Sequence, residues 1–201
     1  MADLSQDGSI CALHEACEIT RIGQGVDATG KLAAKPIKRT LGVLEDYSRI
    51  MTENGVTQRA AIGTSALRDA QNGESFCKQA ESLLGCPIST ISGKREAELI
   101  FGGVETCFEL RKKNTLVFDI GGGSTEFILS HATDKPIELM SLNCGAVRLT
   151  ERFLLHDPPQ ETELVAAKQE ISRALVKLPQ SFSETPSTLI GVSGTATTLA
   201  T

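Results

Sequence analysis

Residues 116–127 read LVFDIGGGSTEF, an apolar run that ends in Asp119, turns through three glycines and a hydroxyl pair, and reaches a second acid at Glu126. Glycines let a backbone turn sharply and come close to phosphate oxygens, while Ser124 and Thr125 add side-chain donors. A carboxylate at the end of a buried strand can also hold a divalent cation, directly or through water. Three glycines alone are equally consistent with an ordinary β-turn. The flanking acids and hydroxyls make a phosphate-binding loop the better prediction.

Two other glycine-loop chemistries do not match this chain. A P-loop needs Gly-Lys followed by Ser or Thr, but Lys31 is followed by leucine and Lys94 by arginine. A dinucleotide-binding fingerprint needs a third glycine three residues after Gly123, where Glu126 stands instead. Neither scheme explains the loop.

The composition is that of an ordinary soluble protein. With 201 residues, 40% of them hydrophobic, the chain can build a core in one domain or two small ones. A net charge of −5 argues against a nucleic-acid-binding surface, and the only basic run, residues 111–113, is expected to be a solvated loop. No apolar run approaches the roughly 20 residues that span a bilayer, and the N-terminus lacks a signal-peptide pattern. We therefore expect a cytoplasmic protein that partners neither nucleic acid nor membrane.

The cysteines and histidines form no recognisable metal or redox motif. None of the six cysteines belongs to a C-x-x-C pair, which argues against a zinc ribbon or a redox site and predicts free thiols. His14, His131 and His156 lie far apart in the sequence, and we expect surface or loop positions for them.

The first half of the chain predicts alternating strands and helices. Apolar residues spaced by three and four predict a helix that opens at Pro36 and ends before Gly55. The other expected elements are two strands of a meander within residues 9–26, a strand at 59–62, a helix over 76–84, a strand at 87–91 and a helix over 94–108 capped by Ser92. This alternation is typical of a βαβ layout with a largely parallel sheet. The polar stretch 111–114 is the natural boundary between two lobes.

The second half begins with two strands, 115–120 and 125–130, on either side of the glycine loop. The further expected elements are a hairpin tip at 134–136, a strand at 137–142, a short helix from 145 to about 155, a longer helix over 161–178 and a strand at 188–192. That last strand enters Ser193, Gly194 and Thr195, a second hydroxyl-and-glycine turn before another helix.

Three segments together resemble the exopolyphosphatase and guanosine pentaphosphate phosphohydrolase (Ppx/GppA) family: TSALRDAQN at 64–72, SGKREAELI at 92–100 and FDIGGGSTE at 118–126. TRIGQG at 20–25, GAVRLT at 145–150 and GVSGTATTLA at 191–200 extend the resemblance, in order, over nearly the whole chain. It implies an α/β fold of the actin-like ATPase superfamily. Two ribonuclease-H-like lobes, with mixed sheets flanked by helices, would face each other across a phosphate-binding cleft. The lobes would span residues 1–112 and 113–201.

The resemblance also implies a reaction. Family members hydrolyse a terminal phosphoanhydride with the help of a metal ion, expected to be magnesium. They release orthophosphate from inorganic polyphosphate or the 5′-phosphate of guanosine pentaphosphate. The sequence does not choose between these two partners, because both present the same terminal group. It also leaves the oligomeric state open, a homodimer included.

Residue by residue, the resemblance assigns roles to both halves of the chain. Glu96 matches the catalytic glutamate, which would orient or deprotonate the attacking water, and Arg68 matches an arginine whose planar fork would grip phosphate oxygens. Without the motif, both would be taken as solvated helix residues. Asp119 and Glu126 match the acidic pair that would hold magnesium or the water. The expected phosphate contacts are Gly121, Gly122, Gly123 and Ser124, with Ser193, Gly194 and Thr195 closing the cleft from the far side.

Departures from the family pattern concern the chain ends and one side chain. The family begins with an apolar strand that enters an Asp-x-Gly-Ser-Asn-type loop; the nearest candidate here, Asp7-Gly8-Ser9, looks like a turn instead. The sequence also stops at Thr201, where closing helices should follow. We therefore expect a fragment with both lobes incomplete and with little hydrolase activity. Arg95, where the family usually has a second acid, would lower the pKa of Glu96 or point to solvent.

Two other functions stay open at this point. An actin-like kinase would transfer phosphate from ATP, because the superfamily cleft serves both chemistries. A non-catalytic sensor would bind guanosine pentaphosphate without turnover.

Overall fold

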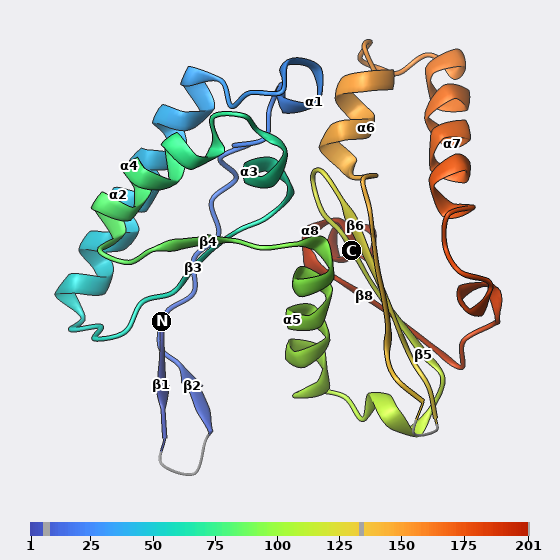
Figure 1. Ribbon diagram of the computed structural model, residues 1–201, viewed down its shortest axis with the longest axis horizontal. Coiled ribbons are helices and arrows are strands. Elements are labelled where there is room, and N and C mark those ends of the chain that lie inside the picture. The colour runs from blue at the N-terminus through green and yellow to red at the C-terminus, as the bar shows by residue number, and fades with distance from the viewer. Residues whose placement is uncertain (6–8, 133–134, 201) are drawn as a thin grey trace.

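The structure is a computed structural model that describes residues 1–5, 9–132 and 135–200. Asp7 and Gly8 of the expected N-terminal turn, Asp134 of the expected hairpin tip and the final residue Thr201 lie outside this description. Helices and mixed sheets form two groups that stand side by side, a smaller N-terminal group and a larger C-terminal group (Figure 1). Within the described ranges, no helix combines the length and the apolar character needed to cross a membrane.

The larger group is built on a four-stranded sheet of β5 (Thr115–Ile120), β6 (Thr125–Ser130), β7 (Glu138–Leu142) and β8 (Thr188–Val192). Its strand order is β7-β6-β5-β8. The pairs β5–β6 and β6–β7 are antiparallel, whereas β8 runs parallel to β5. Helix α8 (Ser193–Ala200) contacts β5 and β8, while α6 (Ala146–Phe153) and α7 (Glu161–Leu175) pack against each other.

Helix α5 (Gly93–Glu105) supplies one side of the core of the larger group. Ala97, Phe101 and Val104 recur at helical spacing on one face, where they bury against Val117 of β5 and Ile128 of β6. Val117 and Ile128 are fully buried because their alternate positions in β5 and β6 face this helix. The packing fixes α5 against the sheet and thereby fixes its first turn near the glycine loop.

The smaller group has its own core. Its elements are α1 (Val26–Thr29), α2 (Ala34–Glu53), β3 (Ala61–Gly63), α3 (Ser65–Asp69), α4 (Gly73–Leu84) and β4 (Ile88–Thr90). Its buried cluster is Val26, Leu32, Ala70, Phe76, Cys77 and Ala80. Strands β3 and β4 pair in parallel, and β1 (Ala2–Leu4) with β2 (Ile10–Ala12) forms a separate hairpin at one end (Figure 1). Short 3₁₀ turns, Leu110–Lys112 and Gln180–Ser183, complete the description.

Most of the predicted elements are present. The strands predicted at 115–120, 125–130 and 188–192 have the predicted bounds. Ser92 caps α5, accepting a hydrogen bond from the backbone nitrogen of Arg95 at 3.2 Å. Gly55 and Gly85 follow α2 and α4 in the left-handed conformation, with φ of 65° and 67°, as the helix-end pattern predicted. The local sequence predicted these helix ends correctly, because a capping serine or a terminal glycine marks each of them.

The meander predicted within residues 9–26 is wrong in its second strand. Ile10–Ala12 does form β2, but its partner is β1, and no strand is assigned from residue 13 to residue 25. Ile19, an expected strand residue, is 82% exposed. An apolar alternation makes a strand only when a neighbouring strand pairs with it, and none does so among the described residues. The sheets of the first half are accordingly only partly parallel.

Helix α5 precedes the predicted lobe boundary near residue 112, yet it shares its core with the sheet that follows that boundary. Its apolar face meets β6 and β7 rather than the helices of the smaller group. The division into 1–112 and 113–201 stays a prediction. The packing places α5 structurally with the larger group.

Candidate active site

Three carboxylates from three elements converge at the end of the β5–β6 hairpin. Asp119 pairs directly with Glu126 in the antiparallel register of β5 and β6, and residues paired in this way project from the same face of a sheet. Glu96 comes from the first turn of α5, which packs on this sheet. Burial, and then the nearby charges of Glu126 and Asp119, raise the pKa of Glu96. The structure thus brings the three predicted catalytic acids into one site.

Glu96 faces Arg68, which comes from α3 in the smaller group. Arg68 Nη1 lies 3.6 Å from Glu96 Oε2 and donates a hydrogen bond to the carbonyl oxygen of Ile91 at 2.6 Å. Burial raises the pKa of Glu96 to about 7, with Glu126 adding to the rise and Arg68 opposing it. Among the described residues, the buried Oε2 atom has no hydrogen-bond partner. This carboxylate can therefore hold a water or accept a proton near neutral pH.

Glu126 is the most buried of the three acids, with 1% of its surface exposed. Burial raises its pKa, while the hydroxyls of Ser141 and Ser124 lower it. Ser141 Oγ donates to Glu126 Oε1 at 2.7 Å from the directly paired position on β7. A Cβ atom at Gly93 would collide with Ser141, so glycine there lets the start of α5 approach the sheet. Ser141 was missed by sequence reasoning because a single strand serine carries no pattern.

Asp119 is held from the other side by the turn after β8. Ser193 Oγ donates to Asp119 Oδ2 at 2.8 Å, although Ser193 has the left-handed φ of 66° that non-glycine residues rarely adopt. Burial raises the pKa of Asp119, and the Ser193 hydroxyl opposes that rise. Its other oxygen, Oδ1, is buried with no hydrogen-bond partner in the described part of the chain. An orphan carboxylate oxygen of this kind is suited to a cation or a water.

The glycines of the loop allow neighbouring atoms to come closer than a side chain would permit. They do not supply unusual backbone dihedral angles. Gly121 donates to the carbonyl oxygen of Ser124 at 3.0 Å, and none of the three glycines has a left-handed φ. A Cβ atom at Gly123 would lie 2.5 Å from Ser65 Oγ of α3. The backbone N–H groups of Gly122 and Gly123 donate to no described residue. These amides are free donors of the kind that cradles a phosphate.

The second hydroxyl-and-glycine turn lies beside the first. Thr195 Oγ1 donates to the carbonyl oxygen of Ile120 at 2.8 Å, which ties the start of α8 to the end of β5. Ser193 reaches Asp119 as described, while Gly194 has no neighbouring atom within 4 Å of a Cβ position. The structure therefore brings Ser193 to Asp119 and Thr195 to the end of β5, with Gly194 between them in the chain.

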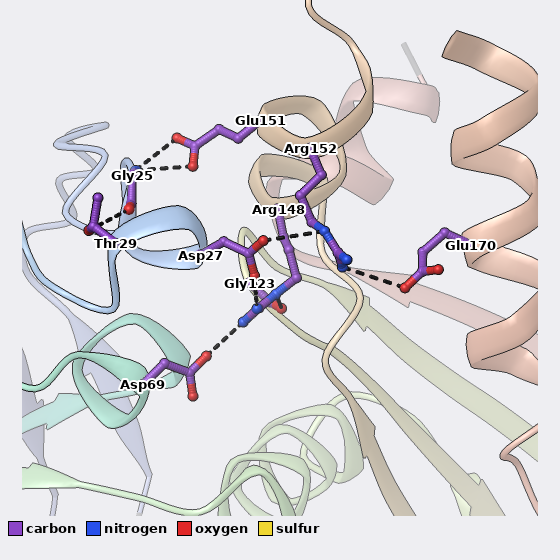
Figure 2. Close-up of polar contacts among 9 residues, drawn as sticks. All are labelled: Gly25, Asp27, Thr29, Asp69, Gly123, Arg148, Glu151, Arg152 and Glu170. Atoms are coloured by element: carbon purple, nitrogen blue, oxygen red, sulfur yellow. Dashed lines mark hydrogen bonds and ion pairs between the residues drawn. The ribbon is translucent and has the colours of Figure 1, made fainter. Parts of the chain in front are cut away.

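Arg148, which the sequence did not mark as a site residue, joins the glycine loop to the smaller group. Its Nε donates to the carbonyl oxygen of Gly123 at 2.9 Å. Its terminal nitrogens form ion pairs with Asp27 of α1 and, at 2.6 Å, with Asp69 of α3 (Figure 2). Asp69 and Arg148 both lie in segments that carried the family resemblance, but their charges alone gave no reason to pair them.

Neighbouring side chains of α6 extend this polar contact. Both carboxylate oxygens of Glu151 accept from the backbone nitrogen of Gly25, at 3.1 and 3.0 Å. Arg152 lies 3.4 Å from Asp27 and 3.5 Å from Glu170 of α7 (Figure 2). Charged side chains of α6 thus contact the loop before α1, helix α1 itself and helix α3.

A cavity of about 260 Å³ opens next to these contacts. Its lining includes Gly122 and Gly123 of the glycine loop, Ser65 of α3 and Arg148 of α6. None of the three acids lines it. The glycine loop therefore borders an open space that residues of both groups line.

Fold and site together define an α/β protein with a glycine loop and an acidic cluster suited to phosphate chemistry. Residues 3–201 match the Ppx/GppA phosphatase family, and the chain belongs to that family. This confirms the family predicted from the sequence, and with it the expected α/β class of mixed sheets flanked by helices.

Proteins similar to this chain include an exopolyphosphatase and a bifunctional enzyme with a phosphatase activity in its name. Exopolyphosphatase 2 of Mycobacterium tuberculosis is 35% identical, and the match covers 96% of this chain and 61% of that protein. The bifunctional 3-dehydroquinate synthase/phosphatase of Fusobacterium nucleatum is 37% identical over 92% of this chain and 29% of its own length. The crystal structure of an exopolyphosphatase from Cytophaga hutchinsonii matches with a TM-score of 0.89 and 32% identity, covering 99% of this chain and 64% of that one. The chain thus spans about 61% of the first of these relatives.

Proposed function

We propose that this chain carries the site of an exopolyphosphatase-type phosphohydrolase, which releases terminal orthophosphate from inorganic polyphosphate or guanosine pentaphosphate. The observation that carries the proposal is the contact between Arg68 and Glu96, a half-buried acid whose pKa is about 7. The backbone amides of Gly122 and Gly123, which have no acceptor among the described residues, add anion donors. These groups supply the base, the anion donors and the positive charge that hydrolysis of a phosphoanhydride requires. Membership of the Ppx/GppA phosphatase family supports the same reaction.

Glu96 is the proposed base. With a pKa of about 7 it exchanges a proton readily at neutral pH. Its Oε2, which accepts no hydrogen bond from the described residues, can accept one from the attacking water. Arg68, beside it, can donate two hydrogen bonds to phosphate oxygens. Glu96 would then remove the proton from water while Arg68 stabilises the negative charge on the phosphate oxygens. Both side chains lie within 3.6 Å of each other, so one phosphate can reach both.

Asp119 and Glu126 are the proposed holders of magnesium. The buried, unpartnered Oδ1 of Asp119 fits this role, and magnesium is usually held by one or two carboxylates, waters and substrate phosphates. Among the described residues, no group of three acids, histidines or cysteines is placed to hold a metal ion by itself. When bound, magnesium would neutralise phosphate charge and polarise the bond that breaks.

The two turns are the proposed phosphate-binding elements. The amides of Gly122 and Gly123 are free, and Gly121 and Ser124 shape the loop that presents them. Ser193, Gly194 and Thr195 would close the site from the β8 side, where the first and third already contact the end of β5. We further infer a cytoplasmic location, and we leave open whether two copies associate.

The test is phosphate release by the purified chain from polyphosphate and, separately, from guanosine pentaphosphate, with and without magnesium and with no phosphate acceptor. We expect slow, magnesium-dependent release that falls by about 100-fold or more in Glu96→Gln, the range of a general base. Glu98→Gln is the matched control, because Glu98 lies two residues further along α5 in a surface pair with Arg95. Release that requires an acceptor would support a kinase. Tight binding of guanosine pentaphosphate without any release would support a sensor.

A further inference from the structure

We propose that Arg148 is a positioning residue: by joining the glycine loop to α3, it sets where Arg68 stands relative to the phosphate cradle. The role in catalysis rests on the proposed function, whereas the geometric role does not. The residue lies on α6, and its ion pairs are with Asp27 and Asp69 rather than with Glu96, Asp119 or Glu126.

On the loop side, Arg148 is anchored at two successive carbonyls. Its backbone nitrogen donates to the carbonyl oxygen of Gly122 at 3.0 Å, and its Nε donates to that of Gly123 at 2.9 Å. Because the guanidinium group is planar and rigid, fixing Nε also fixes the directions in which the terminal nitrogens point. The carbonyls of the loop are thus occupied from α6, which leaves its N–H groups as the ligand-binding side.

On the other side, the same guanidinium holds α3. Its Nη2 pairs with Asp69 at 2.6 Å, and Asp69 is the residue directly after Arg68. These two neighbours reach in different directions, Asp69 to α6 and Arg68 to Glu96 and Ile91. Helix α3 has only five residues and no side-chain cap at its start. Its placement therefore depends on contacts made by its side chains with the rest of the molecule.

In the described part of the chain, the smaller and larger groups do not share a hydrophobic core. The buried clusters of the smaller and larger groups share no residue, and the contact between α1, α3 and α6 is made by charged side chains (Figure 2). The side chains of Arg148 and Asp27 are 17% and 19% exposed, so their pairing is shielded from solvent more than an ordinary surface pair is. Removing one member of such an ion pair leaves the charge of the other member without a partner.

The experiment compares Arg148→Lys and Arg148→Gln with the control Arg152→Gln on the same helix. Lysine keeps the charge but has one nitrogen, which cannot reach Gly123, Asp27 and Asp69 together. Arg152 also pairs with Asp27 but does not contact the glycine loop or α3. The first readout is amide hydrogen exchange in residues 65–69. We expect exchange at least tenfold faster in both Arg148 variants and within twofold of wild type in the control.

The second readout is the kinetics of phosphate release. We expect at least a tenfold loss of kcat in Arg148→Lys with KM changed less than threefold, because the free loop amides still bind phosphate while Arg68 is misplaced. Asp69→Asn should reproduce the loss of kcat. Combining it with Arg148→Gln should cause little further loss, because both substitutions remove the same ion pair between Arg148 and Asp69.

Two results would overturn the proposal: unchanged exchange in α3 of Arg148→Lys, or equal effects of Arg152→Gln. If the wild-type chain releases no phosphate, the proposed function fails, while the exchange comparison still decides whether Arg148 positions α3. If wild type is active and Arg148→Lys keeps its kcat, the proposed function stands and the positioning role in catalysis fails.

Discussion

Replacing Glu96 by glutamine should stabilise the fold at alkaline pH while it removes the proposed base. The pKa of this carboxyl rises from 4.5 to about 7 on folding, chiefly because burial disfavours its charge, and its side chain is only 17% exposed. One pKa unit corresponds to about 1.4 kcal/mol, so the ionised form costs the native state about 3 kcal/mol of unfolding free energy. Glutamine has the same shape and carries no charge, so the variant avoids this cost.

The pH dependence has a definite sign. Because the native state has the higher pKa, it binds the extra proton between pH 4.5 and about 7. The stability that the protonated carboxyl contributes is complete below pH 4.5 and is lost as the pH rises through about 7. Glu96→Gln should therefore gain about 3 kcal/mol over wild type between pH 4 and pH 8.

Urea unfolding of both proteins at pH 4, 6 and 8 measures this difference. Glu98→Gln is the control: Glu98 is 38% exposed and pairs with Arg95 at the surface, so its difference from wild type should change by less than about 1 kcal/mol over the same range. If the gain of Glu96→Gln at pH 8 is no larger than its gain at pH 4, burial does not destabilise the Glu96 charge. The assignment of Glu96 as a base poised near neutral pH would then be refuted.

Three further predictions concern Arg68 and the two glycine-and-hydroxyl turns. Arg68→Gln removes a charge that lowers the pKa of Glu96, so the rising limb of the pH–rate profile should move to higher pH. Gly123→Ala places a Cβ atom 2.5 Å from Ser65 Oγ and should cost about 1–3 kcal/mol in thermal unfolding; adding Ser65→Ala should recover part of it, and no recovery would argue against this contact. Ser193→Ala keeps the strained φ of 66° and loses the hydroxyl, whereas Ser193→Gly loses both the hydroxyl and Cβ and thereby relieves the strain. Urea unfolding should therefore find Ser193→Gly the more stable by about 1 kcal/mol, and equal stabilities would contradict the strain.

Part of the site could be predicted because its geometry is local. The hairpin around the glycine loop places Asp119 opposite Glu126 through the register of two adjacent strands, and the turn residues are explicit in the sequence. Glu96 and Arg68 required the family resemblance, since nothing local distinguishes them from solvated helix residues. The second strand predicted near Ile19 failed because strand formation depends on a partner that the local pattern does not reveal.

The sequence by itself determined the order of the elements, the two glycine-and-hydroxyl turns, the family and the acids that could carry the chemistry. The elements and turns follow from hydrophobic periodicity and turn residues, which act over a few positions along the chain. The family and the role of Glu96 follow from the resemblance of several motifs in order along the chain. Only the tertiary structure decided that α5 packs on the larger sheet, that Ser141 donates to Glu126, and that Arg148 joins the loop to α3. Arg148 and Asp69 of α3 are 79 positions apart, and such contacts depend on how separately folded elements pack, which no short stretch of sequence specifies.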